Sequence, residues 1–530
     1  MMADNTNMTE DEKVLHGMGY AQELTRRMGA FQNFAISFAI ICIVAGGITS
    51  FPVALSSGGG GAIGITWVVG SAFALVVAAA MGQIASSYPT AGGIYHWSSI
   101  FGSKGYGWAA AWFNLLGLIF VVSSVNMGVF LLFRDLFLAQ VVGMDVTSWT
   151  STGELSQGWW IQTIFIAVVT LAQVIINHYF LRLTTILTDW SGYIIMITAL
   201  VLTAAMLIWA PTHDFSRLFR FGNFTGPAGG DVWPAAQVGL YVFALSFLHV
   251  VYTITGFDAS AHTSEETRDA QKEVPKGMIR SVWYSFLFGY IMVCSFVLAL
   301  PDGTDSAGNA VDGVTAGAAQ GWNAFNWLIA QVPMPSLLRS LIIIGIVVSN
   351  FLCALAGLTS TSRMMYAFAR DGGLPASKTL SKVDPKLRTP GAAIWAAGVL
   401  AVLATLYGGA FLILSTGCAV FLYLSYLMPI AAAMRAEIGG NWKNKGPFNL
   451  KGASLLVGAL AVVGCAVLIF AGVQPPQEKV LYLIVGMIVV MLVVWFGGLR
   501  NSFQGPPVGE EIRKRQAAIV AAEKALAGAK

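Results

Sequence analysis

Long apolar runs are the feature that most constrains this chain. Runs of about 18 or more residues with few charges recur along the sequence, and a run of that length is long enough to cross the hydrocarbon layer of a membrane. The backbone finds no water there, so each segment must satisfy its own hydrogen bonds, as a helix does. We therefore predict an all-α membrane protein.

The apolar runs predict about twelve transmembrane helices. The expected spans are 31–54, 64–87, 106–133, 159–177, 185–210, 235–261, 277–300, 337–366, 391–407, 410–433, 454–473 and 479–498. Polar segments precede and follow them, at residues 1–30 and 499–530, and the Ala-rich end of the second segment is typical of a surface helix.

The distribution of lysine and arginine predicts the orientation. If the N-terminus lies inside, the inner loops and both terminal segments hold 25 of the 30 Lys and Arg residues. Loops rich in these residues stay on the cytoplasmic side. We therefore expect a multi-pass protein of the cell's inner (plasma) membrane, with cytoplasmic N- and C-termini and the lipid bilayer as its surroundings.

Two spans contain glycine and small polar residues near mid-depth. The first span contains AGGITSFP (residues 45–52), and the sixth contains TITGFDAS (residues 253–260). Such interruptions at matching places in two halves are typical of inverted-repeat transporters. They predict two five-helix repeats, 31–210 and 235–433, followed by two further helices over 454–498. Alternatively, each glycine only allows close helix packing.

Asp258 is the most informative single residue, because a carboxylate inside a membrane is costly and usually functional. We expect it to pair with a substrate ammonium group or to accept a coupling proton; alternatively, it caps the second half of the sixth helix. Gly46 and Gly47 are predicted to leave free N–H groups that attract a carboxylate. Free carbonyls in the sixth span would accept from the ammonium group. Phe257 is either an aromatic lid over the substrate or a packing residue.

Other polar residues inside the spans have two interpretations each. Thr359 and Ser360 supply adjacent hydroxyls that either bind a hard cation or bond back to their own helix. Asn126 in the third span either faces the substrate pocket or bonds to a neighbouring helix. His249 is interpreted as a hydrogen-bonded core residue rather than a proton relay.

The sequence lacks the motifs that are typical of several other function classes. No basic stripe with interleaved aromatics predicts nucleic-acid binding, and no glycine-rich loop ending in Gly-Lys-Ser/Thr predicts ATP-driven pumping. The five cysteines lie inside apolar runs without metal-ligand spacing. We therefore expect no enzyme, no metal and no cofactor beyond a coupling H⁺ or Na⁺.

Three motifs resemble one known family. They are TGFDASAHTSEETRDAQKEVPKGM (residues 255–278), GQIASSYPTAGGIYHW (82–97) and TSRMMYAFARDGGLP (361–375). Over residues 20–500 the chain resembles the amino acid–polyamine–organocation superfamily, and within it the amino acid/choline transporter family. The resemblance implies two inverted five-helix repeats with two added helices, and substrates such as amino acids, 4-aminobutyrate, choline or polyamines.

The resemblance also implies which residues bind. Carried onto this chain, the substrate carboxylate site falls at Ala45, Gly46 and Gly47, and the ammonium site at Thr255, Gly256 and Asp258. Thr359 and Ser360 match the place where sodium-coupled relatives bind their ion. The chain departs from many relatives at Gln83, where they have a titratable glutamate, and in its fifth span, which lacks the lysine of some proton-coupled relatives.

Together these observations predict a secondary active transporter that imports an amino acid or small amine by alternating access, coupled to an ion or proton. Three alternatives stay open at this point. The protein could exchange one amino acid or amine for another, could be a permease specific for choline, polyamines or 4-aminobutyrate, or could be a transporter-like sensor.

Overall fold

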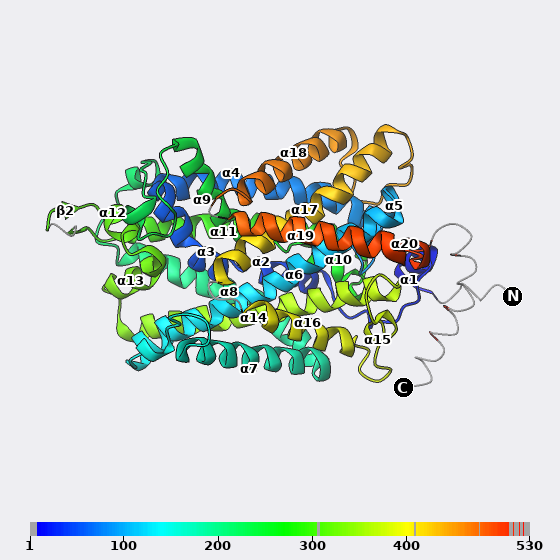
Figure 1. Cartoon of the computed structure of the whole chain (residues 1–530), viewed down its shortest axis with the longest axis horizontal. Helices are drawn as coiled ribbons and strands as arrows, with labels where there is room; N and C mark the ends of the chain where they lie inside the picture. The colour runs from blue at the N-terminus through cyan, green and yellow to red at the C-terminus, as the bar shows by residue number, and fades with distance from the viewer. Residues whose placement is uncertain are drawn as a thin grey trace.

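The computed structural model describes residues 8–304, 308–406, 410–475 and 477–507, together with Ile512, Ile519 and Glu523. Long helices lie side by side in one bundle (Figure 1). Among the described residues, ten helices are long and apolar enough to cross a membrane, and two shorter apolar helices occupy the other two predicted spans. The prediction of an all-α membrane protein is confirmed, and each of the twelve predicted spans corresponds to an apolar helix.

The spans are formed by the following helices. They are α2 (Ala30–Ile41) with α3 (Ile43–Thr49), α4 (Phe51–Ser87), α6 (Lys104–Leu132) with η2 (Phe133–Val142), α7 (Gln157–Tyr179), α8 (Leu181–Ile208), α9 (Gly239–Thr253) with α10 (Ala259–His262), α11 (Ala270–Ala299), α14 (Ser336–Arg370), α16 (Gly391–Ala404), α17 (Ala410–Ile438), α18 (Ser454–Gly472) and α19 (Glu478–Val494).

Short elements connect these helices at the two ends of the bundle. They are α1 (Glu10–Gly17), α5 (Ile94–Phe101), η3 (Thr147–Trp149), η4 (Phe215–Leu218), η5 (Gly226–Gly229), η6 (Ser264–Glu266), β1 (Gly303–Thr304), β2 (Ala310–Val311), α12 (Gly313–Ala318), η7 (Gly321–Asn323), α13 (Ala324–Gln331), α15 (Ser377–Leu380), η8 (Lys451–Ala453), η9 (Trp495–Leu499) and α20 (Arg500–Ser502). The antiparallel β1–β2 pair, α12 and α13 lie at one end, and α1 and α20 lie at the other (Figure 1).

The connection between the first two spans differs from the prediction. We expected a loop over residues 55–63, but α4 runs from Phe51 to Ser87 and changes direction at Gly59, where φ is +70°. Backbone carbonyls of Arg217 and Arg220 lie 2.3 and 2.6 Å from where a Cβ would stand at Gly60 and Gly61. The glycines therefore let a neighbouring loop pack directly against this helical segment.

Burial separates an inner from an outer set of helices. Most residues of α3 and of α6 are buried, whereas α18 and α19 expose large apolar side chains such as Val463, Phe470 and Val490. Extensive apolar exposure of this kind suits a lipid environment rather than water. The predicted surface helix near the C-terminus lies largely outside the described residues.

Candidate functional site

The first spanning segment is broken at Cys42. This residue has a φ of +32° and separates α2 from α3, and the Ala45 N–H donates to its Sγ at 3.4 Å. The Gly46 N–H donates to the Cys42 carbonyl at 2.9 Å, and Gly47 lies within the same helix. The break was predicted in the correct helix, but the expectation of free N–H groups at Gly46 and Gly47 is wrong.

Close packing explains these two glycines. A Cβ at Gly46 would lie 2.8 Å from the Thr253 side chain, and one at Gly47 would lie 2.8 Å from Cε of Met292. A larger residue at either position would push α3 away from α9 or α11. Small residues commonly allow this kind of approach between membrane helices.

The sixth span is broken where the sequence predicted. Helix α9 ends at Thr253 and α10 begins at Ala259. Gly256 has a φ of +80°, and a Cβ there would lie 2.4 Å from Cγ2 of Ile40. Only glycine adopts that backbone region without strain and leaves room for such an approach. The two broken segments therefore meet directly at Gly256 and Ile40.

Two tyrosines of α17 hold the unwound segment. The Tyr423 hydroxyl donates to the Ile254 carbonyl at 2.9 Å, and the Gly256 N–H donates to the Tyr426 hydroxyl oxygen at 3.2 Å. These bonds satisfy backbone groups that a continuous helix would have paired itself. Sequence reasoning missed both tyrosines, because nothing in the apolar tenth span indicates which face meets the sixth.

Asp258 is completely buried between three elements. Asn114 of α6 donates to Oδ2 at 2.9 Å and Tyr426 donates to Oδ1 at 2.7 Å, while Nε2 of His262 lies 3.0 Å from Oδ2. The carboxylate makes no side-chain capping bond to α10, so the capping alternative is wrong. Both carboxylate oxygens are already occupied in this conformation.

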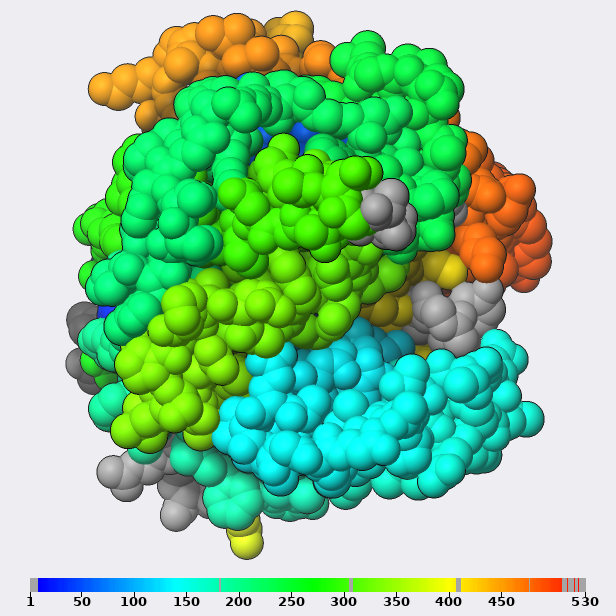
Figure 2. Space-filling view, turned by 90° about the vertical axis from the view of Figure 1, so that its left-hand side faces the viewer, coloured from blue at the N-terminus to red at the C-terminus, as the bar shows by residue number. Residues whose placement is uncertain are grey.

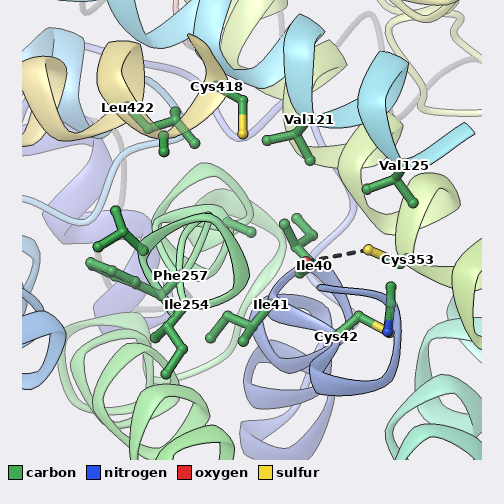
Figure 3. Close-up of a cluster of buried hydrophobic side chains, with 14 of the residues drawn as sticks. Ile40, Ile41, Cys42, Val121, Val125, Ile254, Phe257, Cys353, Cys418 and Leu422 are labelled. Carbon is green, nitrogen blue, oxygen red and sulfur yellow. Dashed lines mark hydrogen bonds between the residues drawn. The ribbon is translucent and has the colours of Figure 1, made fainter. Parts of the chain in front are cut away.

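A small central cavity of about 20 Å³ lies between the two breaks. Its described lining residues are Ile40, Ile41, Ala45, Gly46, Val121, Val125, Tyr252, Thr255, Cys353 and Cys418. Figure 3 shows several of these side chains pointing toward one another from different helices, with the Cys353 thiol donating to the Ile40 carbonyl at 3.3 Å. Ala45, Gly46 and Thr255 are therefore the predicted site residues that line this cavity.

A larger cavity of about 720 Å³ reaches the end of the bundle that carries α12 and α13. Its lining includes Thr150, Trp322 and Phe411 near that end, and Ile48 and Thr49 of α3. Figure 2 looks onto this end, which is hollowed between the cyan segment around α6 and η3 and the green segment around α13. Ile48 and Thr49 lie one helical turn from Ala45, so the central cavity lies just beneath this opening.

Two other predicted residues, Asn126 and Phe257, lie outside the lining of the central cavity. Asn126 bonds to Thr170 and exchanges two bonds with Gln173, each at 2.9 Å, so it joins α6 to α7 and does not line the central cavity. Phe257 is buried with its ring centroid 5.1 Å from that of Tyr426, as its packing alternative predicted.

The predicted ion site also lies away from the central cavity. The Thr359 hydroxyl lies 2.6 Å from Oδ1 of Asn177 and 3.0 Å from the Leu355 carbonyl. Ser360 is buried and its hydroxyl has no hydrogen-bond partner among the described residues. Thr359 lines a separate cavity of about 20 Å³ together with Arg363 and Glu266, whose side chains pair at 2.8 Å.

His249 and Gln83 have structural partners. Nδ1 of His249 lies 2.7 Å from the Ser50 hydroxyl, which links α9 to the end of α3. Gln83 donates to Ser454 at 2.8 Å and accepts from the Leu450 N–H at 2.7 Å. The first pair agrees with the interpretation of His249 as a hydrogen-bonded core residue.

The opposite end of the bundle is closed by buried ion pairs. Arg370 at the end of α14 makes a two-pronged contact with Glu265, at 2.9 and 3.0 Å, and its guanidinium lies 4.0 Å from the Tyr20 ring centroid. Burial raises the pKa of Glu265, but the charge and hydrogen bonds of Arg370 outweigh burial, so the pKa lies below its usual value.

The N-terminal segment, residues 9–29, completes this closure. The Tyr20 hydroxyl donates to Asp371 at 2.7 Å and lies 2.7 Å from His96. The Arg27 and Met28 N–H groups donate to the Glu266 carbonyl at 2.9 and 2.8 Å. This segment therefore ties α5, the loop before α11 and the end of α14 together. From the sequence alone it was predicted only to be a polar cytoplasmic segment.

Comparisons with known proteins agree with this architecture. The model of the amino acid permease family matches residues 29–496. The chain is 31% identical over 520 residues to "Amino-acid permease BAT1" of Arabidopsis thaliana, covering 93% of this chain and 95% of that protein. It is 29% identical to the rice (Oryza sativa subsp. japonica) "Amino-acid permease BAT1 homolog", covering 93% and 94%. It is 28% identical to the "GABA-specific permease" of Saccharomyces cerevisiae, covering 75% and 66%.

Proposed function

The chain belongs to the amino acid permease family of the amino acid–polyamine–organocation superfamily, and from that premise we propose that it imports an amino acid or small amine by alternating access. The observation that supports this proposal is an asymmetry between the two ends of the bundle. One end opens into the cavity of about 720 Å³, whereas the other is sealed by the Glu265–Arg370 and Glu266–Arg363 pairs.

The open end faces the outside in this proposal. The described parts of the two terminal segments, α1 and α20, lie at the sealed end. The Lys and Arg distribution assigns this end to the cytoplasm of a cell bounded by its plasma membrane. The conformation is then outward-open. Import follows when the bundle closes above the central cavity and separates the ion pairs below it.

The two five-helix halves, 31–210 and 235–433, move relative to each other in this cycle. Inverted-repeat transporters rock one set of helices against the other around a fixed site. Residues of both interrupted helices, Ala45, Gly46 and Thr255, line that site. Asp258 acts by holding α6, α10 and α17 in register through its three partners.

Proton coupling is the second part of the proposal. The cavity beside Thr359 is lined by Arg363 and Glu266, which pair with each other at 2.8 Å, so this carboxylate is already neutralised and is a poor ligand for a hard cation such as Na⁺. We therefore expect uptake to persist when Na⁺ is replaced by K⁺, and to increase with an inward proton gradient.

The test is uptake of labelled amino acids into proteoliposomes that contain the purified protein. Uptake driven by a proton gradient without internal substrate supports a symporter. Uptake that occurs only into vesicles preloaded with amino acid would identify an exchanger instead. Absence of uptake and exchange for every amino acid and amine tested would refute transport.

A further inference from the structure

We propose that the central cavity selects net-neutral zwitterions with a compact apolar body and rejects substrates that carry any additional charge. This inference rests on the proposed transport function and narrows it to a substrate class. Alanine, valine and 4-aminobutyrate belong to the accepted class. Lysine, arginine, glutamate, diamines such as putrescine, and the quaternary amine choline are rejected.

The lining of the cavity supplies the first argument. Four aliphatic side chains, Ile40, Ile41, Val121 and Val125, surround it. The other described side chains that line it are neutral at physiological pH, and the polar ones among them are the Tyr252 and Thr255 hydroxyls and two thiols. A substrate body placed here exchanges water for apolar contacts, which favours aliphatic carbon.

The second argument is that the described residues around the two cavities offer no available counter-ion. Asp258 already accepts from Asn114 and Tyr426 and lies 3.0 Å from His262. In the outer cavity, Arg134 and Asp135 are paired with each other at 2.5 Å. A second ammonium or carboxylate on the substrate would lose its water without gaining an opposite charge, which is strongly unfavourable.

A single zwitterion can be satisfied without a charged side chain. The Thr255 hydroxyl is buried beside the Tyr426 side chain and lines the cavity, where its second bonding position can serve a substrate. The Ile254 carbonyl, which accepts from Tyr423, keeps a second lone pair that can accept from an ammonium group. Such groups pair with one ammonium and one carboxylate but leave no provision for a third charge. Choline lacks the carboxylate and presents no N–H donor.

The size of the cavity limits the substrate body. At about 20 Å³ the cavity has room for about one water molecule in this conformation, so it must widen to admit a substrate, and Val121 and Val125 stand one turn apart on the same face of α6. Val121 also lies against α14, where its Cγ1 would be 3.4 Å from a Cβ at Gly357. Because both valines project from a packed helix, they restrict how far the cavity can widen for a bulky side chain.

Competition measurements test the charge rule, which is that the cavity rejects substrates carrying any charge beyond those of a net-neutral zwitterion. Proteoliposomes take up labelled alanine in the presence of an excess of each unlabelled compound. We expect valine and 4-aminobutyrate to compete, and lysine, glutamate, putrescine and choline to be weaker by about a hundredfold or more, because a buried unpaired charge discriminates strongly. Lysine or putrescine competing as well as valine would overturn the inference. If no compound is transported, the proposed function fails, which is a different result.

Two substitutions test the cavity directly. The first substitution, Val121→Ala, removes two methyl groups from the cavity wall. It should raise kcat/KM for leucine relative to kcat/KM for alanine by about tenfold, because the apolar pocket gains room for the larger side chain. The matched control is Val129→Ala, a buried valine of α6 that does not line the cavity and should leave the ratio unchanged. Equal ratios in both variants would contradict the assignment of Val121.

The second substitution, Cys418→Asp, places a carboxylate in the cavity. It should lower alanine uptake and create measurable lysine or putrescine binding, detected as a ligand-dependent rise in the Tm of the purified protein. A Cys418→Asp protein that folds but gains no affinity for either cation would count against the charge rule. Val121→Ala keeps the inference testable if this variant does not fold.

Discussion

Asp258 connects three helical segments through one buried carboxylate. Its partners are Asn114, Tyr426 and His262, and both oxygens are used. A buried polar group that loses a partner costs about 1–3 kcal/mol of the free energy of unfolding. At the scale of single residues, this arrangement makes Asp258 a positioning residue for the unwound segment.

Asp258→Asn should therefore lower the Tm and slow uptake while substrate binding persists. The amide replaces one acceptor oxygen with a donor, so it cannot keep the bonds from both Asn114 and Tyr426. Thermal unfolding with and without alanine measures the effect, with about 1–3 kcal/mol lost in stability. If the variant keeps its stability but loses the stabilisation by alanine, Asp258 contacts the ammonium group directly.

Gly256 is the residue at which the two broken helices touch. Gly256→Ala places a Cβ 2.4 Å from Ile40 and forces alanine to adopt a φ of +80°. Strained backbone of this kind costs about 1–3 kcal/mol, and we expect uptake to fall severely. The control is Gly239→Ala at the start of α9, where a Cβ would meet nothing within 4 Å. Similar uptake by the two variants would contradict this account.

At the scale of elements, the N-terminal segment and the loop before α11 form the closure at the sealed end. Two buried carboxylates there, Glu265 and Asp371, have pKa values below their usual range. For both, burial acts in the opposite direction, and hydrogen bonds and positive charges outweigh it: Arg370 for Glu265, and His96 with Arg370 for Asp371. The ionised forms therefore stabilise the closed end.

This closure should weaken in acid. A carboxylate whose folded pKa is depressed contributes stability above its unfolded pKa, and that contribution is lost as the pH falls toward the folded pKa. The usual values are 4.5 for Glu265 and 3.8 for Asp371, so the loss should begin below about pH 4.5. Tm measured between pH 7 and pH 3 checks this expectation. The Glu265→Gln variant should have a lower Tm at pH 7, and its Tm should change less with pH than that of the unmodified protein. An unchanged slope in that variant would disprove the role of Glu265.

At the scale of the whole molecule, the open and sealed ends define a direction. The sealed end carries α1 and α20, and the open end carries η3 and α13 (Figure 1). All five cysteines are buried, so thiols introduced at exposed positions can be labelled against a low background. The orientation predicted from Lys and Arg can therefore be measured in intact cells.

Thr152→Cys, between η3 and α7, should react with a membrane-impermeant maleimide in intact cells. Asn501→Cys, in α20, should react only after the membrane is permeabilised. Both positions are exposed, so a difference between them reports the side of the membrane rather than burial. Labelling of Asn501→Cys in intact cells would invert the proposed topology.

The sequence by itself determined the class of fold, because the length and polarity of each apolar run set where a helix must cross the membrane. It also identified the two interrupted helices and located the second break, since glycine and small polar residues stand out in apolar segments. The tertiary structure decided the rest. It moved the first break to Cys42, turned Asn126 toward α7, and surrounded Asp258 with partners.

The physical reason is that these outcomes depend on contacts between distant segments. Tyr423 and Tyr426 hold residues 254–258 from about 170 positions away in the chain, and Tyr20 reaches Asp371 across 351 positions. Local composition sets the depth of a residue in the bilayer, but it does not set the rotation of its helix. Helix packing sets that rotation, and with it which side chains face the central cavity.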